Sequence, residues 1–218
     1  MSRFKAFILL GKTPVQQWQS AYVVSYFYKM EYAAFLRKHI EEIMPLSDEE
    51  FEKVLPYFKP VQIRRKDLLI KGGKKVTAEY LVINGLLKAF MYDDMEREHI
   101  MQFAMENWWI SDYPAYRLQS KGELCVQALE PCLVLELSLE NKQRMCEAVP
   151  AMYRFHGAKA FGGFVALQKR VLSLMKNSAK EKYELLLEQY PELFQRVSKT
   201  MIAHYLGVSR ETLSRLQK

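Results

Sequence analysis

The side chains best suited to chemistry lie near the C-terminal end of the sequence. On a helix of 3.6 residues per turn, four polar side chains there fall within about 140° of one another. The four are Arg210, Glu211, Ser214 and Arg215. Arginine can donate two hydrogen bonds to O6 and N7 of guanine, and glutamate can accept one from N4 of cytosine. The pattern therefore predicts a face that contacts base edges in the major groove of double-stranded DNA.

A helix-turn-helix over residues 199–218 would position this face. Ile202 and Leu206 lie four residues apart, so they share one face of a first helix. Leu213 and Leu216 share one face of a second helix, opposite the polar side chains. The two apolar faces can bury each other. The alternative is a helical hairpin on the protein surface that makes no contact with DNA.

The residues between these apolar positions suit a steep crossing of two short helices. Ala203 is small where the helices approach, and Gly207 can adopt the left-handed conformation that ends a helix. Ser209 is predicted to cap the N-terminus of the second helix. Contacts with DNA phosphates are expected from Lys199, Thr200 and Ser209.

The motif SRET at residues 209–212, with Arg215 and with the motif IAxxLG at residues 202–207, resembles the DNA-binding helices of the Crp/Fnr family of bacterial transcription regulators. The resemblance implies base recognition by Arg210, Glu211 and Arg215. It also implies a sequence-specific regulator whose partners are double-stranded DNA and RNA polymerase. Members of the family often continue into a β-hairpin wing, whereas this sequence ends three residues after Arg215, so a missing wing is expected. The alternative function is a ligand-sensing or protein-interaction module that has lost DNA binding.

The net charge of +7 is spread unevenly over the 218 residues. Residues 1–29 carry +4, residues 30–149 carry −4 from 16 basic and 20 acidic side chains, and residues 150–218 carry +7 from 12 basic and 5 acidic side chains. A basic C-terminal third that contains the helix-turn-helix motif is typical of a module that faces phosphates. No apolar run reaches the roughly 20 residues that cross a bilayer, so no membrane partner is expected.

Short strands are predicted between Val61 and Ser138, where apolar residues recur with a period close to two. Seven or eight such runs are separated by turn signals at intervals of about 8–12 residues, which indicates an antiparallel sandwich or jelly roll. Asn84-Gly85 is the best candidate for a hairpin turn. The residues expected in the core are Leu81, Ile83, Leu87, Phe90, Met101, Phe103, Val126, Leu133 and Leu135.

After Glu140 the apolar period returns to 3.6 residues, and a heptad seam runs through a predicted helix of about 27 residues. Such a helix is roughly 40 Å long, which is too long for so small a domain to bury alone. A homodimer packed helix against helix is therefore predicted. The alternative is that the seam packs on the chain's own roll. The interface residues are Tyr153, Ala160, Phe164, Leu167, Val171 and Leu174.

This order predicts an α+β fold in which an antiparallel β-roll or jelly roll, like a cyclic-nucleotide-binding domain, precedes a long dimerisation helix and a helix-turn-helix domain. It matches the Crp/Fnr architecture over residues 31–217. Capping boxes over residues 47–50 and 178–181 predict two further helix starts. Residues 1–29 are predicted to be an extension, either a poorly ordered arm or a segment upstream of a true start at Met30. The remaining predicted units are residues 30–149, 150–177 and 178–218.

The resemblance also bears on the effector. In members that bind cyclic nucleotides, a glycine-glutamate pair holds the ribose and an arginine-serine or arginine-threonine pair holds the cyclic phosphate. These pairs align with Ser111-Asp112 and Gly122-Glu123. The arginine whose guanidinium would neutralise the phosphate is missing from the second pair. Glu123 would instead place a negative charge beside the negative phosphate. The pocket is therefore expected to be degenerate and to bind no cyclic nucleotide. Aromatic residues that could line an apolar pocket, or simply belong to the core, are Trp108, Trp109, Tyr113 and Tyr116.

Neither a cofactor nor a metal ion is expected. Cys125, Cys132 and Cys146 lack CxxC spacing, which favours reduced thiols in a cytoplasm, and three thiols are too few for an iron–sulfur cluster. The histidines stand alone in the sequence, and His99 is the single one in the predicted roll, whereas a cupin enzyme needs several around its metal. Because the sequence also lacks a nucleophile elbow, a phosphate loop and paired acids, an enzyme is not expected.

Overall fold

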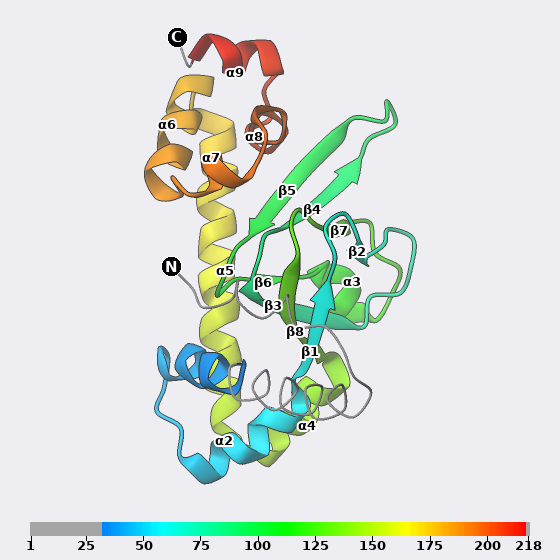
Figure 1. Cartoon of the computed structure of the whole chain (residues 1–218), viewed down its shortest axis with the longest axis vertical. Helices are drawn as coiled ribbons and strands as arrows, with labels where there is room; N and C mark the ends of the chain where they lie inside the picture. The colour runs from blue at the N-terminus through cyan, green and yellow to red at the C-terminus, as the bar shows by residue number, and fades with distance from the viewer. Residues whose placement is uncertain (1–31, 217–218) are drawn as a thin grey trace, which may run out of the picture.

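The computed structural model describes residues 32–216 (Figure 1). The predicted extension over residues 1–29 and the last two residues of the predicted helix-turn-helix lie outside this range. The elements up to the middle of the chain are a helix over residues 32–41, α2 (Asp48–Val54), the 3₁₀ helix η2 (Leu55–Tyr57), β1 (Lys59–Ile63), β2 (Leu68–Ile70), β3 (Ala78–Asn84), β4 (Leu87–Tyr92), β5 (Glu98–Ala104) and β6 (Trp109–Ile110). They are followed by α3 (Tyr113–Leu118), β7 (Cys125–Ala128), β8 (Cys132–Ser138), α4 (Leu139–Ala148), α5 (Ala151–Lys176), α6 (Ala179–Gln189), α7 (Leu193–Arg196), α8 (Lys199–Leu206) and α9 (Arg210–Leu216).

The strands form two four-stranded antiparallel sheets, which together make a roll. One sheet has the strand order β1-β8-β3-β6 and the other has the order β2-β7-β4-β5. Alternate residues of β3 face opposite sides of its sheet, so Tyr80 and Val82 pack inside the roll while Leu81 packs against helices outside it. The predicted α+β class with an antiparallel roll is confirmed.

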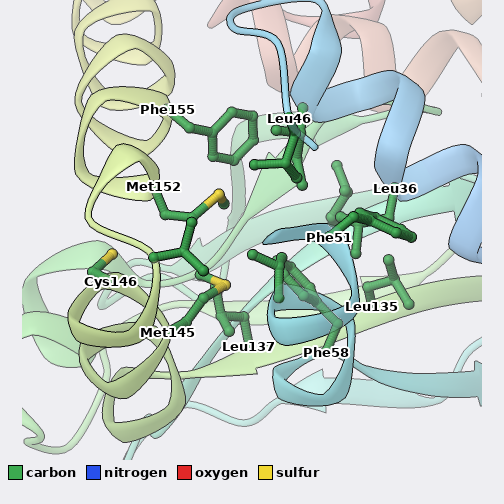
Figure 2. Packing of buried hydrophobic residues seen from close by; sticks show 14 of the residues in the cluster. Leu36, Leu46, Phe51, Phe58, Leu135, Leu137, Met145, Cys146, Met152 and Phe155 are labelled. Carbon is green, nitrogen blue, oxygen red and sulfur yellow. The ribbon is translucent and has the colours of Figure 1, made fainter. Parts of the chain in front are cut away.

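A second core lies outside the roll, between the N-terminal helices and the start of α5 (Figure 2). Phe51 of α2 and Leu137 of β8 belong to it, together with Met145 of α4 and Phe155 of α5. Leu137, Met145 and Phe155 are completely buried. Burying a large apolar side chain contributes about 1.5–3 kcal/mol, so this core fixes the first turns of α5 against the roll.

Both predicted capping boxes are confirmed. The Ser47 hydroxyl accepts a hydrogen bond from the amide of Glu50, whose carboxylate accepts one from the amide of Ser47. Ser178 and Glu181 repeat this exchange at the start of α6. Each box satisfies two amides that would otherwise lack partners in the first turn of a helix.

Most of the predicted core residues are buried, and one is not. Met101 is 44% exposed, so its assignment to the core is wrong. The register between β4 and β5 shifts at this point, because Ala89 is opposite Gln102 and Phe90 is opposite Ile100. Met101 is therefore the extra residue of a β-bulge, which turns its side chain outward. Ile83 and Leu133 are half-buried, and the fully buried members are Leu81, Leu87, Phe90, Phe103, Val126 and Leu135.

The predicted hairpin at Asn84-Gly85 is wrong. β3 pairs with β8 and β6, whereas β4 pairs with β5 and β7, so the chain changes sheets at this turn. Gly85 has a φ of +106°, and a Cβ atom there would lie 2.5 Å from Sγ of Cys132. The glycine is needed for a close crossing between the sheets. The hairpin of this region instead joins β4 to β5, through a turn that begins at Asp93.

Helix α5 contains 26 residues and runs along one side of the roll to the C-terminal helices (Figure 1). Its N-terminal part is buried through Met152 and Phe155. From Gly157 onward most residues of the helix are exposed, although Arg170 is half-buried. The seam residues are all exposed, and they are Tyr153, Ala160, Phe164, Leu167, Val171 and Leu174.

Candidate nucleic-acid interface

Helices α8 and α9 have the geometry expected of a helix-turn-helix. Gly207 ends α8 with a φ of +66°, in the left-handed conformation. The Ser209 hydroxyl accepts a hydrogen bond of 3.1 Å from the amide of Thr212 and so caps the start of α9. The apolar faces of the two helices share one core. Its most buried members from this pair are Ile202, Ala203, Leu206 and Leu213.

The polar face of α9 points to solvent. Arg210, Glu211, Ser214 and Arg215 are all exposed, while Leu213 on the opposite side is 1% exposed. The pKa of Glu211 is lowered by a hydrogen bond from its own backbone amide and by the Ser209 side chain, with nearby Arg210 and Arg215 adding to the shift. The carboxylate is therefore ionised at neutral pH and can act as a hydrogen-bond acceptor.

The three expected phosphate contacts lie at the starts of the two helices. Lys199 is exposed at the first residue of α8, Thr200 follows it and is half-buried, and Ser209 precedes α9. Ser198, which the sequence reading missed, caps α8 through a hydrogen bond of 3.3 Å from the amide of Met201. Amides at a helix start and a neighbouring lysine suit a phosphate.

The helix-turn-helix is docked on the roll of the same chain, and the side chains that hold it there were not singled out from the sequence. Arg196 of α7 donates hydrogen bonds of 2.9 and 3.0 Å to the carboxylate of Glu106, which follows β5. It also pairs with Glu130 at 2.5 Å. The apolar residues beneath include Phe103 of β5 and Ile202 of α8 in one core.

A second link joins α5, β5 and α8. The guanidinium of Arg170 donates hydrogen bonds to the backbone carbonyls of Ile100, at 3.1 Å, and Tyr205, at 2.8 Å. It also lies 3.6 Å from the centre of the Tyr205 ring, within the range of a cation–π contact. Nearby, His204 Nδ1 lies 3.5 Å from the carboxylate of Glu98.

The residues of the expected degenerate pocket lie close together. Asp112, and not Glu123, supplies the carboxylate that the backbone of this loop binds. Asp112 is 4% exposed, and its carboxylate accepts hydrogen bonds from the amides of Ala115, Glu123 and Leu124 at 2.9–3.1 Å. The backbone of Gly122 approaches so closely that a Cβ atom would lie 3.0 Å from Asp112 Oδ2. The side chain of Glu123 is exposed, so the anion in this loop is the carboxylate of Asp112.

The histidines of the second core are buried and neutral. Burial lowers the pKa of His39 to about 4 and that of His156 to about 3. Trp109 Nε1 donates a hydrogen bond of 3.0 Å to His39 Nε2, which places Trp109 in this core beside both rings. Within residues 32–216 no group of three or more histidine, cysteine or acidic side chains is arranged to hold a metal ion, and the cysteines are free thiols.

No family model matches the chain. A curated relative is the cAMP-activated global transcriptional regulator CRP of Haemophilus influenzae, which is 23% identical over 199 residues, or 82% of this chain and 88% of the relative. The anaerobic regulatory protein of Aggregatibacter actinomycetemcomitans is 21% identical over 77% of this chain and 68% of the relative. Among solved structures, the c-di-GMP responsive global regulator CLP of Xanthomonas campestris has a TM-score of 0.64 at 16% identity, over 78% of this chain and 89% of that chain.

The chain is similar in sequence to transcription regulators of the Crp/Fnr type and shares their fold. This similarity agrees with the resemblance found in the sequence, and both of these curated relatives are named as regulators. Among the described residues, no helix is both long enough and apolar enough to span a membrane.

The candidate residues of the chain lie in three separate places. The polar side chains of α9 form one exposed group, the seam of α5 forms a second, and the loop around Asp112 forms the third. The residues that link these places, Arg170 and Arg196, were missed because each meets partners that are distant in the sequence. Their only signal was that both are basic residues in a basic third of the chain.

Proposed function

We propose that this chain is a transcription regulator of the Crp/Fnr type, a homodimer that inserts α9 into the major groove of a palindromic DNA site and does not respond to cyclic nucleotides. The observation that carries the proposal is the polar face of α9. Its arginines and its carboxylate are exposed and ionised, on a helix whose opposite side is anchored by Leu213. Base edges of guanine and cytosine are the chemical partners of such a face.

The surface of α5 supports the dimer. Phe164 is 61% exposed and the three apolar residues that follow it in the seam are also exposed, although each exposed apolar side chain forgoes favourable burial. A second copy of the same helix presents the same heptad stripe, so the two stripes can bury each other around a two-fold axis. A two-fold dimer presents two copies of α9, and the half-sites are then expected about one helical turn, roughly 34–36 Å, apart.

The loop around Asp112 supports the lack of a response to cyclic nucleotides. A cyclic phosphate needs amide donors and a cation at its binding site. Here the amides of Glu123 and Leu124 already donate to the buried carboxylate of Asp112. A phosphate in this loop would compete with a carboxylate of the chain itself, and the aligned pair Gly122-Glu123 supplies no arginine to neutralise it.

In vitro selection of bound DNA from a random pool tests the proposal. The full chain is expected to enrich a palindromic sequence that contains guanine and cytosine in each half-site. Enrichment should be the same with and without cyclic AMP or cyclic GMP, and isothermal titration should detect no micromolar binding of either nucleotide. If no sequence is enriched, the module without DNA binding becomes the better description.

A further inference from the structure

The turn between α8 and α9 lies against α5, the helix of the proposed dimer. Arg170 and Leu174 lie one helical turn apart on α5. The guanidinium of Arg170 donates a hydrogen bond of 2.8 Å to the carbonyl of Tyr205, in the last turn of α8. A Cβ atom on Gly207, which ends α8, would lie 3.9 Å from Cδ2 of Leu174, so this leucine lies beside the glycine. Two successive turns of α5 therefore meet the end of α8.

Arg170 caps the C-terminus of α8 from another helix. The last four carbonyls of a helix have no partner within the helix, and that of Tyr205 is one of them. A positive charge at this end also interacts favourably with the helix dipole. The guanidinium lies 3.6 Å from the centre of the Tyr205 ring, which in turn lies 5.2 Å from the ring of Phe103 in β5. Because Arg170 contacts both the backbone and the ring of Tyr205, it restricts the rotation of α8 as well as its translation.

A further acceptor of Arg170 lies on the roll. Its Nη2 also donates a hydrogen bond of 3.1 Å to the carbonyl of Ile100 in β5, the end strand of its sheet. The side chain is half-buried, and burial lowers its pKa, while a side-chain hydrogen bond with Tyr205 opposes this shift. Shielding from water strengthens such hydrogen bonds. Arg170 thus joins α5, β5 and α8, whereas the preceding residue of α5, Lys169, is exposed.

The place of α8 on α5 determines the distance between the two copies of α9 in the proposed dimer. The two-fold axis runs along the α5 seam, so any displacement of α9 relative to α5 occurs in both protomers. Base pairs are about 3.4 Å apart along a duplex, so a displacement of about 1.7 Å in each protomer changes the matching half-site separation by one base pair. A small shift of α8 is therefore enough to change which DNA spacing fits.

We propose that Arg170 is a positioning residue that selects the spacing between the two half-sites of the DNA target. It acts without contact with DNA, by holding the end of α8 at a fixed place on α5 and β5. The side chains of α9 read the bases within each half-site, and Arg170 determines how far apart the half-sites lie. The inference rests on the proposed function, because it requires a dimer that binds a palindromic site.

Fluorescence anisotropy on palindromic duplexes that differ only in their spacer tests the inference. The half-sites are those selected from the random pool, and the spacers are one or two base pairs shorter or longer than the selected one. The unmodified chain should prefer one spacer by at least about fivefold, since a wrong spacing must be absorbed by deforming the DNA. Arg170→Met has a long side chain that donates no hydrogen bond, and it should reduce this preference below about twofold or move it to another spacer.

Matched variants separate spacing from charge and from base reading. Lys169→Met removes the neighbouring positive charge of α5 and should leave the spacer preference unchanged. Arg170→Lys retains a charged donor and should restore part of the preference. Arg210→Ala should alter the ratio between matched and mismatched half-sites and keep the preferred spacer, whereas Arg170→Met should do the reverse. Tyr205→Leu keeps the carbonyl but removes the ring, so it should also weaken the spacer preference if Arg170→Met does not fold.

The outcomes distinguish this inference from the proposed function. An unchanged spacer preference in folded Arg170→Met, or in Tyr205→Leu if the first variant does not fold, would overturn the inference even if the affinity fell equally for all duplexes. An equal loss of preference in Lys169→Met would also overturn it. Sequence-specific binding by the unmodified chain with no preferred spacer would reject the inference alone. Failure of the unmodified chain to bind any selected duplex would reject the proposed function and the inference together.

Discussion

The guanidinium of Arg196 donates two hydrogen bonds to the carboxylate of Glu106, and this bidentate ion pair, the Arg196 fork, links α7 to the segment after β5. The two residues are 90 positions apart in the sequence. The side chain of Arg196 is 20% exposed and that of Glu106 is 34% exposed, so the pair is partly shielded from water. Glu106 also accepts a hydrogen bond of 2.9 Å from the amide of Gly85, at the turn where the chain changes sheets. The position of the helix-turn-helix is thereby coupled to the geometry of the roll.

Removal of this fork should loosen the contact between the helix-turn-helix and the roll. Arg196→Ala leaves two carboxylates, Glu106 and Glu130, close together without their cation. We expect a loss of about 1–3 kcal/mol in the free energy of unfolding, as for hydrogen bonds to charged groups, with faster amide exchange in α7 and α8. Denaturant unfolding and hydrogen exchange measure the two effects.

The matched control is Arg144→Ala. Arg144 pairs with Glu140 at 2.7 Å, but both side chains are about two-thirds exposed. Its loss should cost no more than about 0.5 kcal/mol, because exposed pairs at this spacing are weak. Equal losses in the two variants would show that the Arg196 fork contributes no more than a surface ion pair.

The buried histidines predict a pH dependence of stability. The folded chain keeps His39 and His156 neutral down to about pH 4 and about pH 3, whereas unfolded histidine takes up a proton near pH 6.5. Between these values the unfolded chain binds more protons, so the free energy of unfolding falls as the pH drops below about 6.5. The slope is at most about 1.4 kcal/mol per pH unit for each proton.

His156→Leu should reduce this slope, because Nε2 of His156 is buried without a hydrogen-bond partner and the variant removes its titration. Urea unfolding at several pH values between about 4 and 7 measures the slope. His99→Leu is the control, since the His99 side chain is 52% exposed, and it should retain most of the dependence. A slope that is unaltered in His156→Leu would contradict the assignment of this ring as a buried neutral group.

Asp112 should be important for the stability of the roll. Asp112→Ala leaves three amide donors, on Ala115, Glu123 and Leu124, without their acceptor in a buried loop. We expect a loss of about 2–4 kcal/mol in the free energy of unfolding, since each unsatisfied buried donor costs about 1–3 kcal/mol and the loop can relax. Asp112→Asn keeps one acceptor oxygen and should lose less. Thermal unfolding of the two variants would argue against this role if their order of stability were reversed.

The helix-turn-helix was predictable because its signals are local. Gly207 ends a helix through its own backbone conformation, and Ser209 caps the next helix through an amide three residues away. The capping boxes and the heptad seam are also set by residues within one or two turns. Each of these patterns depends only on residues that are close to one another in the sequence.

The errors and omissions concern contacts between distant parts of the chain. Asn84-Gly85 has the composition of a hairpin turn, but the strands on either side find partners in different sheets. Met101 follows the period of its strand, but a bulge in the pairing with β4 turns it outward. Arg170 and Arg196 gain their roles from carbonyls and carboxylates that only the tertiary fold brings near. The periodicity of apolar residues in the sequence does not indicate contacts between residues that are distant along the chain.

The seam of α5 makes a prediction about oligomeric state. Leu167→Glu with Val171→Glu would bury unpaired charges between two helices, which should convert the dimer to monomers. Sedimentation velocity measures the change. Leu118→Glu is the control, because Leu118 is an apolar residue of α3 that is 74% exposed and lies outside the seam. A double variant that still sediments as an intact dimer would exclude the seam as the interface.

The last prediction concerns the reading of DNA by α9. Arg210→Ala and Arg215→Ala should each lose a pair of hydrogen bonds to one guanine, which costs about 1–3 kcal/mol and relaxes the preference at one base pair. Glu211→Ala should relax the preference for cytosine at its own position. Lys199→Ala should instead weaken binding to all sequences alike and reduce the salt slope by about one, as expected for a phosphate contact.

Fluorescence anisotropy on matched and singly mismatched duplexes, at two salt concentrations, separates these effects. Arg144→Ala is the control for a lost positive charge, since Arg144 lies on α4 at the opposite end of the molecule from α9 (Figure 1). It should change neither the specificity nor the salt slope. Base contacts alter the ratio between matched and mismatched affinities, whereas phosphate contacts leave that ratio constant. Unchanged ratios in both arginine variants would therefore remove α9 from base recognition, even if the overall affinity fell.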